Sequence, residues 1–243
     1  MNPQMKGLIL KEVKEVYGRK DYLLTMIINT VVYLGAGYIF AVASPTGVLQ
    51  NLFMEFSFIV IPSFAMLIVG FPFIQEKFGD EKLIRRFEAL LTTPISLKTV
   101  WTGKMASIFL LSYPVAIFVI VLLLFAWAVV KGMNPIFILS VPVWVMTLFI
   151  VPLLPMIYAG LSSWFILRFN HPQLMQVLQL VGIGISILIF LSSGRIIRSI
   201  ATGHIVNWPI VAYSTIGVIG SIALIIFLIS KLNKEKNYNL KCS

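Results

Sequence analysis

The chain has 243 residues, of which 59% are apolar and 12% are charged, and its mean hydropathy is +0.96. A soluble domain is about 45–50% apolar and about 25% charged, so the composition excludes an ordinary cytosolic enzyme, a disordered chain and a secreted disulfide scaffold. The few charges are unequal, because 19 Lys and Arg stand against 9 Asp and Glu and give a net charge of +10. In a membrane protein such an excess can encode orientation.

The first twenty residues predict an amphipathic helix, 2–20, that leads into the membrane. Asn2 can cap a helix whose first residue is Pro3, a favoured arrangement at a helix start. Apolar residues then recur at helical spacing, while Lys6, Lys11 and Lys14 fall on the other face. Such a helix lies in the membrane interface, where its cations meet anionic lipid.

Six apolar stretches are long enough to cross a bilayer, which takes about 20 residues. They are 22–43, 52–74, 105–130, 136–167, 173–194 and 208–230. Because they fill most of the chain, we expect one all-α integral membrane domain over residues 1–243. The fourth span contains Pro142, Pro152 and Pro155, and since proline removes a helix donor, we expect this span to be bent or broken.

The positive charges indicate the orientation of these spans. If the six spans alternate in direction, sixteen of the nineteen Lys and Arg fall on one side, mostly before the first span and in 75–104. The positive-inside rule then places both termini and 75–104 in the cytoplasm. We expect a multi-pass protein of the cell membrane, and the high Ile and Lys content suggests a prokaryotic source.

A second cytoplasmic helix is predicted at 80–93, between spans two and three. Asp80 can cap it, Leu83, Phe87 and Leu90 lie on its apolar stripe, and Pro94 should end it. At about 1.5 Å per residue it would be roughly 20 Å long, too short and too charged to span. It could be a simple solvated connector, but connections as long as 75–104 tend to carry function.

The end of this segment carries a family resemblance. Residues 87–96 read Phe-Glu-Ala-Leu-Leu-Thr-Thr-Pro-Ile-Ser, and Gly103 and Lys104 follow at the entry to the next span. With the topology, this pattern resembles the ABC type-2 permeases over nearly the whole chain. The resemblance implies that 2–20 is an elbow helix, that 80–93 is a coupling helix, and that the outer segment 190–208 re-enters the membrane.

The resemblance also implies a function and partners. Such a permease pairs with a second permease subunit, identical or different, and each sits on an ATP-binding subunit that holds ATP and Mg²⁺. It exports a drug, a peptide or a lipid-like molecule. The side chains implied to couple this chain to the ATPase are Leu83, Arg86, Phe87, Glu88, Leu90, Thr93 and Pro94.

The chain shows no motif for chemistry of its own. A phosphate-binding loop needs a glycine separated by four residues from Gly-Lys-Ser/Thr, but Lys98 takes the place of that glycine, and Met105 follows Gly103 and Lys104. We therefore expect no enzyme activity and assign ATP hydrolysis to the partner chain. The two histidines and one cysteine are too far apart in sequence to suggest a metal site, and we expect no bound cofactor and no nucleic-acid partner.

Two other function classes remain open. A stand-alone secondary carrier or channel would need no ATPase, but carriers show internal halves and ionisable residues near the midplane, and neither is evident. An intramembrane serine protease could use the run Gly160, Leu161, Ser162 and Ser163, yet span six has no histidine to serve as its base.

Polar residues inside the spans are candidates for the substrate path or a subunit interface. Span five carries them on one face, and spans one and two carry a single residue each; the candidates are Asn29, Glu55, Gln176, Gln179, Gly182 and Ser186. Lipid would leave such amides unsatisfied, so this face should meet protein or a cavity. The alternatives are ordinary hydrogen bonding between helices, and for Glu55 contact with interfacial water.

Overall fold

The computed structural model describes residues 3–81, 96–132, 134–169, 177, 180–182, 184 and 205–239. The elements it defines there are helical, and two of them, η1 and η2, are π-helices. In chain order they are α1 (Pro3–Tyr17), α2 (Lys20–Ala43), α3 (Val48–Ile74), η1 (Gln75–Asp80), α6 (Leu97–Lys131), α7 (Pro135–Ile138), α8 (Val141–Val145), η2 (Met146–Ile150), α9 (Leu153–Arg168) and α11 (Trp208–Asn239).

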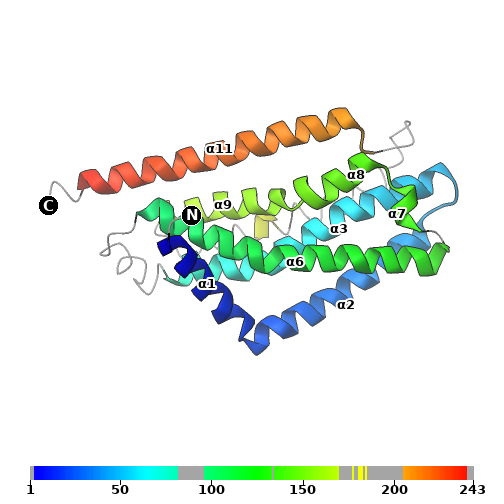
Figure 1. Cartoon of the computed structure of the whole chain (residues 1–243), viewed down its shortest axis with the longest axis horizontal. Helices are drawn as coiled ribbons and strands as arrows, with labels where there is room; N and C mark the ends of the chain where they lie inside the picture. The colour runs from blue at the N-terminus through cyan, green and yellow to red at the C-terminus, as the bar shows by residue number, and fades with distance from the viewer. Residues whose placement is uncertain are drawn as a thin grey trace.

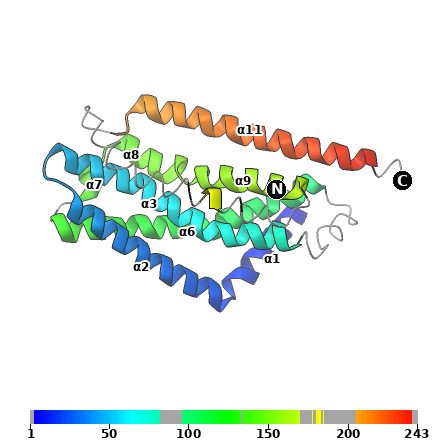
Figure 2. The same ribbon diagram turned by 180° about the vertical axis from the view of Figure 1, so that it is seen from behind.

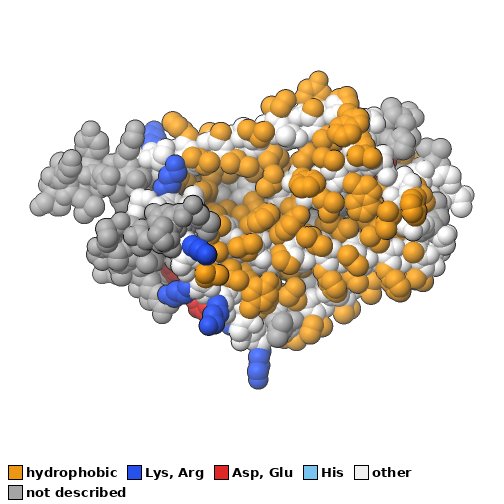
Figure 3. All heavy atoms as spheres, in the orientation of Figure 1, with side chains coloured by type: hydrophobic (Ala, Val, Ile, Leu, Met, Phe, Trp, Pro, Cys, Tyr) orange, Lys and Arg blue, Asp and Glu red, His pale blue; other side chains and the backbone are white. Residues whose placement is uncertain are grey.

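Five helical stretches within the described residues are long and apolar enough to cross a membrane. They are Leu24–Ala43, Leu49–Asp80, Leu97–Lys131, Val141–Arg168 and Trp208–Lys231. Hydrophobic side chains cover most of the face seen in Figure 3, whereas Lys and Arg gather at the end of the bundle where α1 lies, called the α1 end below. An apolar belt with charges at its edge is typical of a protein embedded in a bilayer, so the expectation of a multi-pass helical membrane protein is confirmed.

The long helices run side by side along one axis (Figures 1 and 2). Helix α6 packs against α1, α2 and α3, and α3 also contacts α2 and α9, while α11 lies along α9 at the edge of the bundle. The core therefore lies along α3, η1 and α6, where Phe58, Phe78, Leu111 and Trp127 are fully buried. The outer faces of α2 and α11 expose large apolar side chains, as lipid-facing helices do.

The α1 helix begins at Pro3, as predicted, but it does not run straight into the first span. Backbone bonds close its last turn at Gly18 and Arg19, and the extended conformation of Arg19 separates it from α2. The two helices consequently meet at a sharp angle (Figure 1). This joint places the C-terminal end of α1 beside the end of α3 that continues into η1.

The ends of spans two and three differ from their predicted positions. We expected span two to end at Ile74 and Asp80 to cap a new helix, but α3 continues into η1, which extends through Asp80. Span three begins at Leu97 instead of Met105, because Ser96 accepts a hydrogen bond from the Thr99 N–H (3.1 Å) and caps the helix there. Both helices are thus longer at this end than the predicted spans.

The prediction that span four is broken is confirmed. Its residues form α7, α8, η2 and α9 in succession, with a turn at Val151 and Pro152 between η2 and α9. The Tyr113 hydroxyl on α6 donates to the carbonyl oxygen of Leu148 in η2 (3.1 Å). Neighbouring side chains of this kind satisfy backbone groups where a membrane helix is irregular.

The sixth predicted span, 208–230, corresponds to α11, which continues to Asn239. The fifth, 173–194, lies largely outside the described residues and stays a prediction. Helix α9 ends at the α1 end, whereas α11 begins at the opposite end and returns (Figures 1 and 2). A span between them would join these two ends. The expected coupling helix also lies outside the described residues from residue 82 onward.

Candidate functional site

Charged side chains from four parts of the chain meet at the α1 end. Two come from α1, one from the joint between α1 and α2, three from η1 and the residue after it, and one from α6. This ionic cluster consists of Glu12, Glu15, Arg19, Glu76, Lys77, Glu81 and Lys104. It holds four carboxylates and three cations, so nearly all of its charge is balanced internally.

The centre of the ionic cluster is buried. The Lys104 ammonium is inaccessible to solvent and lies 3.1 Å from Glu12 Oε1 and 2.8 Å from Glu81 Oε1. The other oxygen of Glu12 lies 2.5 Å from Lys77 Nζ, and Lys77 is also buried. Glu12 therefore bridges two buried cations from different elements and ties α1 to both η1 and α6.

The outer part of the ionic cluster faces solvent. The Arg19 guanidinium donates to Glu76 Oε1 and to Glu15 Oε1, both at 2.7 Å, and its side chain is 41% exposed. Lys77 lies 3.5 Å from Glu76 and 3.7 Å from Glu15 and so connects these outer pairs to the buried centre. Exposed pairs contribute little stability, about 0–1 kcal/mol each, so the stabilising effect should concentrate at the centre.

The pattern of α1 explains how Glu12 becomes buried. Ile9, Glu12 and Val16 follow one another at spacings of three and four, which places them on one helix face, and all three are buried against the bundle. Leu10 and Tyr17 remain exposed on a neighbouring face. We predicted α1 as an interfacial helix with its charges facing outward and did not identify Glu12 as a site residue. The position of Glu12 between Ile9 and Val16 on the apolar face was the signal in the sequence.

The ionic cluster also fixes both ends of the segment from which the expected coupling helix would project. Glu81 is the last described residue before that segment, and it is paired with Lys104, two turns into α6. On the other side of that segment, Ser96 is the N-cap of α6, which begins at Leu97. The described residues on either side of 82–95 are thus held on one platform formed by α1, η1 and α6.

The charges change the titration of the cluster. Burial alone would raise the pKa of Glu12, but the hydrogen bond from Lys77 and the charges of Lys104 and Lys77 outweigh it, so that the pKa of this carboxyl lies below its ordinary value of 4.5. At Arg19, partial desolvation is outweighed by the hydrogen bond and charge of Glu76, and then of Glu15, so that its pKa is raised. Both groups stay ionised at neutral pH.

Acid should destabilise the protein through Glu12. A carboxyl whose pKa is lowered by folding adds stability above its unfolded pKa, and that stability is lost as the pH falls through the folded pKa. We therefore expect the melting temperature of the detergent-purified protein to fall as the pH drops below 4.5. A Glu12→Gln variant should show a flatter pH profile over the same range; equally steep profiles would show that other carboxyls cause the acid loss.

Glu55, predicted as a path candidate, has a structural partner. It is buried on α3, and its Oε2 accepts hydrogen bonds from the backbone N–H groups of Ile205 (2.7 Å) and Val206 (3.4 Å). These residues end the predicted outer segment 190–208, whose earlier part lies outside the described residues. Glu55 thus satisfies buried backbone donors and anchors the entry to α11, which explains an acid at this depth.

The other intramembrane candidates are only partly described. Asn29 is buried on the face of α2 that also carries Tyr22 and Tyr33, toward protein. Gly182 is buried, and a Cβ there would lie 2.6 Å from the Phe71 ring and 2.9 Å from the Tyr158 hydroxyl. At Gly182 the predicted polar face of span five therefore meets protein. Gln176, Gln179 and Ser186 lie outside the described residues.

The run considered for a serine protease has a packing role where it is described. Ser163 is fully buried; its hydroxyl donates to the Gly160 carbonyl oxygen (2.8 Å) and accepts from the Trp101 indole N–H (2.7 Å). This bond joins α9 to α6, and an Ile225 side chain of α11 lies close to Gly160. Both histidines of the chain fall outside the described residues.

The seven side chains implied to couple to an ATPase all lie within 82–95 and outside the described residues. They are Leu83, Arg86, Phe87, Glu88, Leu90, Thr93 and Pro94. Across the described part of the chain, no cluster of three or more His, Cys, Asp or Glu is arranged to hold a metal ion.

Comparison with known proteins yields no match: neither a protein-family model nor a curated protein sequence matches this chain.

Proposed function

We propose that this protein is the membrane subunit of an ATP-driven exporter of the ABC type-2 class, coupled through residues 82–95 to a separate ATP-binding chain. The observation that carries the proposal is the ionic cluster at the base of that segment. The cluster joins the C-terminal end of span two (η1), the N-terminal start of span three (α6) and the N-terminal helix α1. The residues that make these contacts are Glu12, Lys77, Glu81 and Lys104. A force applied to 82–95 would reach all three elements together.

The proposed mechanism follows from this rigidity. If an ATP-binding chain moves the 82–95 segment, the buried ion pairs keep α1, η1 and the start of α6 in register, and the spans attached to them move as a unit. Transporters and channels open by such rigid displacements of packed elements. A loose connector between two spans would absorb the same displacement, and it would have no need of two buried lysines.

The partners and cargo are proposed on the resemblance. A second permease subunit, identical or different, would complete the path, and ATP and Mg²⁺ would bind to the partner chain. A drug, a peptide or a lipid-like molecule suits a chain whose spans are this apolar. The proposed location is the cell membrane, and the proposed topology has both termini in the cytoplasm. In this topology the ionic cluster and 82–95 lie on the cytoplasmic side, where ATP is available.

Reversing the charge of Glu88 tests the proposed docking. We expect a Glu88→Lys variant to insert into the membrane and melt as the wild type does, because residue 88 lies outside the cluster. Co-purification of an ATP-binding chain with the tagged protein should fall to background, together with ATP-dependent export. The measurement is affinity purification from membranes of the source cells, followed by mass spectrometry and an ATPase assay.

The matched control is Glu235→Lys, the same charge change near the C-terminal end of α11, which should leave partner recovery unchanged. Recovery of the ATP-binding chain at wild-type level with Glu88→Lys would refute docking through this segment. If the wild-type protein brings down no ATP-binding chain and transports alone in vesicles, a stand-alone carrier or channel is the correct class.

A further inference from the structure

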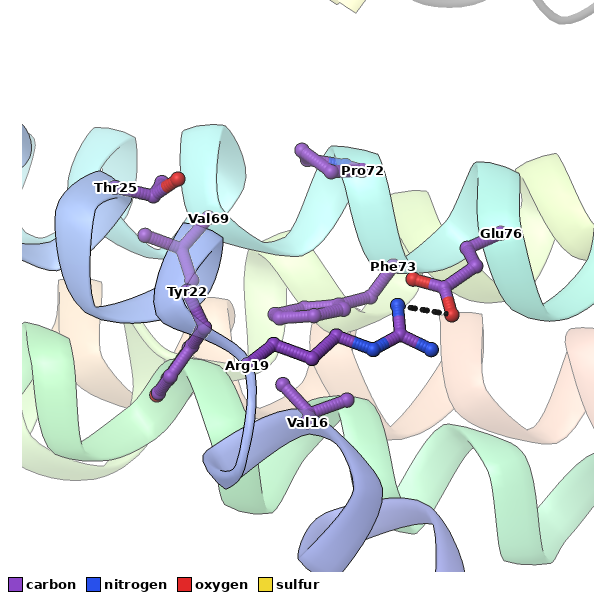
Figure 4. A pocket seen from close by; sticks show the side chains of 8 residues that line it. All are labelled: Val16, Arg19, Tyr22, Thr25, Val69, Pro72, Phe73 and Glu76. Atoms are coloured by element: carbon purple, nitrogen blue, oxygen red, sulfur yellow. Dashed lines mark hydrogen bonds and ion pairs between the residues drawn. The ribbon is translucent and has the colours of Figure 1, made fainter.

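A groove of about 200 Å³ opens beside the joint between α1 and α2, at the α1 end of the bundle (Figure 4). Residues of α1, α2 and the joint form one wall, and the end of α3 with η1 forms the other. The lining residues are Val16, Arg19, Tyr22, Thr25, Val69, Pro72, Phe73 and Glu76.

The groove has two chemically different ends. Arg19 and Glu76 pair at one end, while Thr25 and Val69 lie at the other, and Tyr22 and Phe73 line the space between them (Figure 4). The lining is apolar apart from the ion pair, the Tyr22 hydroxyl and Thr25. The groove therefore suits an elongated ligand with a charged head and a hydrocarbon tail.

The position of the groove matches the edge of a bilayer. Arg19 precedes the candidate span Leu24–Ala43, and Thr25 lies just inside it. From Glu76 back to Val69 is seven residues, or about 10 Å along a helix, and one leaflet of the hydrocarbon core is about 15 Å deep. A lipid with its headgroup at Arg19 would thus place the upper part of one acyl chain along the groove.

The charges at the rim indicate what kind of headgroup fits. Arg19 has five N–H donors, of which its contacts with Glu15 and Glu76 use two, so donors remain for a phosphate. The same two carboxylates are partly exposed, and even with Lys77, which lies 3.5 Å from Glu76 and 3.7 Å from Glu15, the ionic cluster has one more carboxylate than it has cations. An anionic head would meet net repulsion here, whereas a head that adds an ammonium group to its phosphate is neutral overall.

We propose that the groove binds one phospholipid whose headgroup carries a phosphate and a primary ammonium, as in phosphatidylethanolamine. Its phosphate contacts Arg19, its ammonium donates to Glu76 and Glu15, and one acyl chain lies along the groove over the packed rings of Tyr22 and Phe73, whose centroids are 5.8 Å apart. Phosphatidylcholine has a cation that cannot donate N–H hydrogen bonds to these carboxylates, and phosphatidylglycerol has no cation. This inference requires no ATP-binding partner and is independent of the proposed transport function.

Native mass spectrometry of the delipidated full-length protein tests the proposal. The protein is titrated in detergent with phosphatidylethanolamine, phosphatidylcholine or phosphatidylglycerol of identical acyl chains. We expect one phosphatidylethanolamine to bind about tenfold more tightly than either of the others, the difference expected when a charged hydrogen bond is lost. Arg19→Gln should weaken that binding by a similar factor.

A second pair of variants separates the groove from general effects on folding. Thr25→Phe fills the groove without altering charge and should abolish the preference for phosphatidylethanolamine. Val31→Phe adds similar volume to the exposed, lipid-facing side of the same helix and should leave it unchanged. The proposal is wrong if Thr25→Phe binds lipid like the wild type, if no lipid is retained, or if phosphatidylglycerol, drawn by exposed Lys14 and Lys20, binds equally well.

Discussion

A Glu12→Gln variant is expected to unfold more easily than the wild type by about 3–5 kcal/mol, the usual cost of breaking a buried ion pair from one side. The carboxylate of Glu12 is the contact shared by Lys77 and Lys104, and the amide would leave both buried ammonium groups with less compensating charge. The measurement is unfolding of the purified protein in mixed micelles of increasing dodecyl sulfate content at neutral pH.

Two further variants test whether the loss comes from the buried pairs of Glu12. Arg19→Gln breaks pairs at the exposed rim and should cost less than about 1 kcal/mol. Lys104→Met in the Glu12→Gln background removes one of the two undercompensated cations, so the double variant should be at least as stable as Glu12→Gln alone. If the loss in the double variant equals the sum of the losses measured for Glu12→Gln and Lys104→Met separately, Glu12 and Lys104 do not act as a coupled pair.

Hydropathy predicted the membrane-spanning character because burial in lipid requires long apolar helices. Five of the six predicted spans correspond to a long helix or helix series in the described residues, and span four is broken where its prolines fall. The boundaries were less predictable. Residues 75–80 are polar enough to read as loop, yet Lys77, Phe78 and Gly79 are buried in a helical extension of α3, because α1 supplies a carboxylate for Lys77 and α9 packs against this extension, which hydropathy does not represent.

The positions of the charges were predictable, but their roles were not. We assigned the cations before the first span and in 75–104 to lipid and to a partner, yet Arg19, Lys77 and Lys104 bind carboxylates of the chain itself. A pairing between residues ninety positions apart in sequence depends on how α1 folds back onto α6. Only the position of Glu12 on the buried face of α1 indicated it.

The intramembrane candidates show the same limit. A buried acid such as Glu55 is compatible with a substrate path, a proton path or a structural bond, and only the position of the Ile205 and Val206 N–H groups distinguishes the last. Gly182 is similar: a small residue on a polar stripe can line a path or allow two helices to approach, and its spatial neighbours decide between them.

Gly182→Ala is the second large effect we expect, a loss of about 1–3 kcal/mol of stability through overpacking. The added Cβ would lie 2.6 Å from the Phe71 ring and 3.0 Å from Tyr158 Cζ. These two rings already contact each other edge to face, with centroids 5.2 Å apart, so neither can turn aside without disturbing the other. The measurement is the same unfolding titration used for Glu12→Gln.

Gly184→Ala is the matched control, two residues further along. No atom of the described residues lies within 4 Å of a Cβ at Gly184, and alanine favours a helix over glycine by up to about 1 kcal/mol, so this variant should be as stable as the wild type or more so. Equal stabilities of the two variants would show that residue 182 does not pack against α3 and α9. The predicted difference would identify Gly182 as a packing contact, and any path along span five would then have to involve its other polar residues.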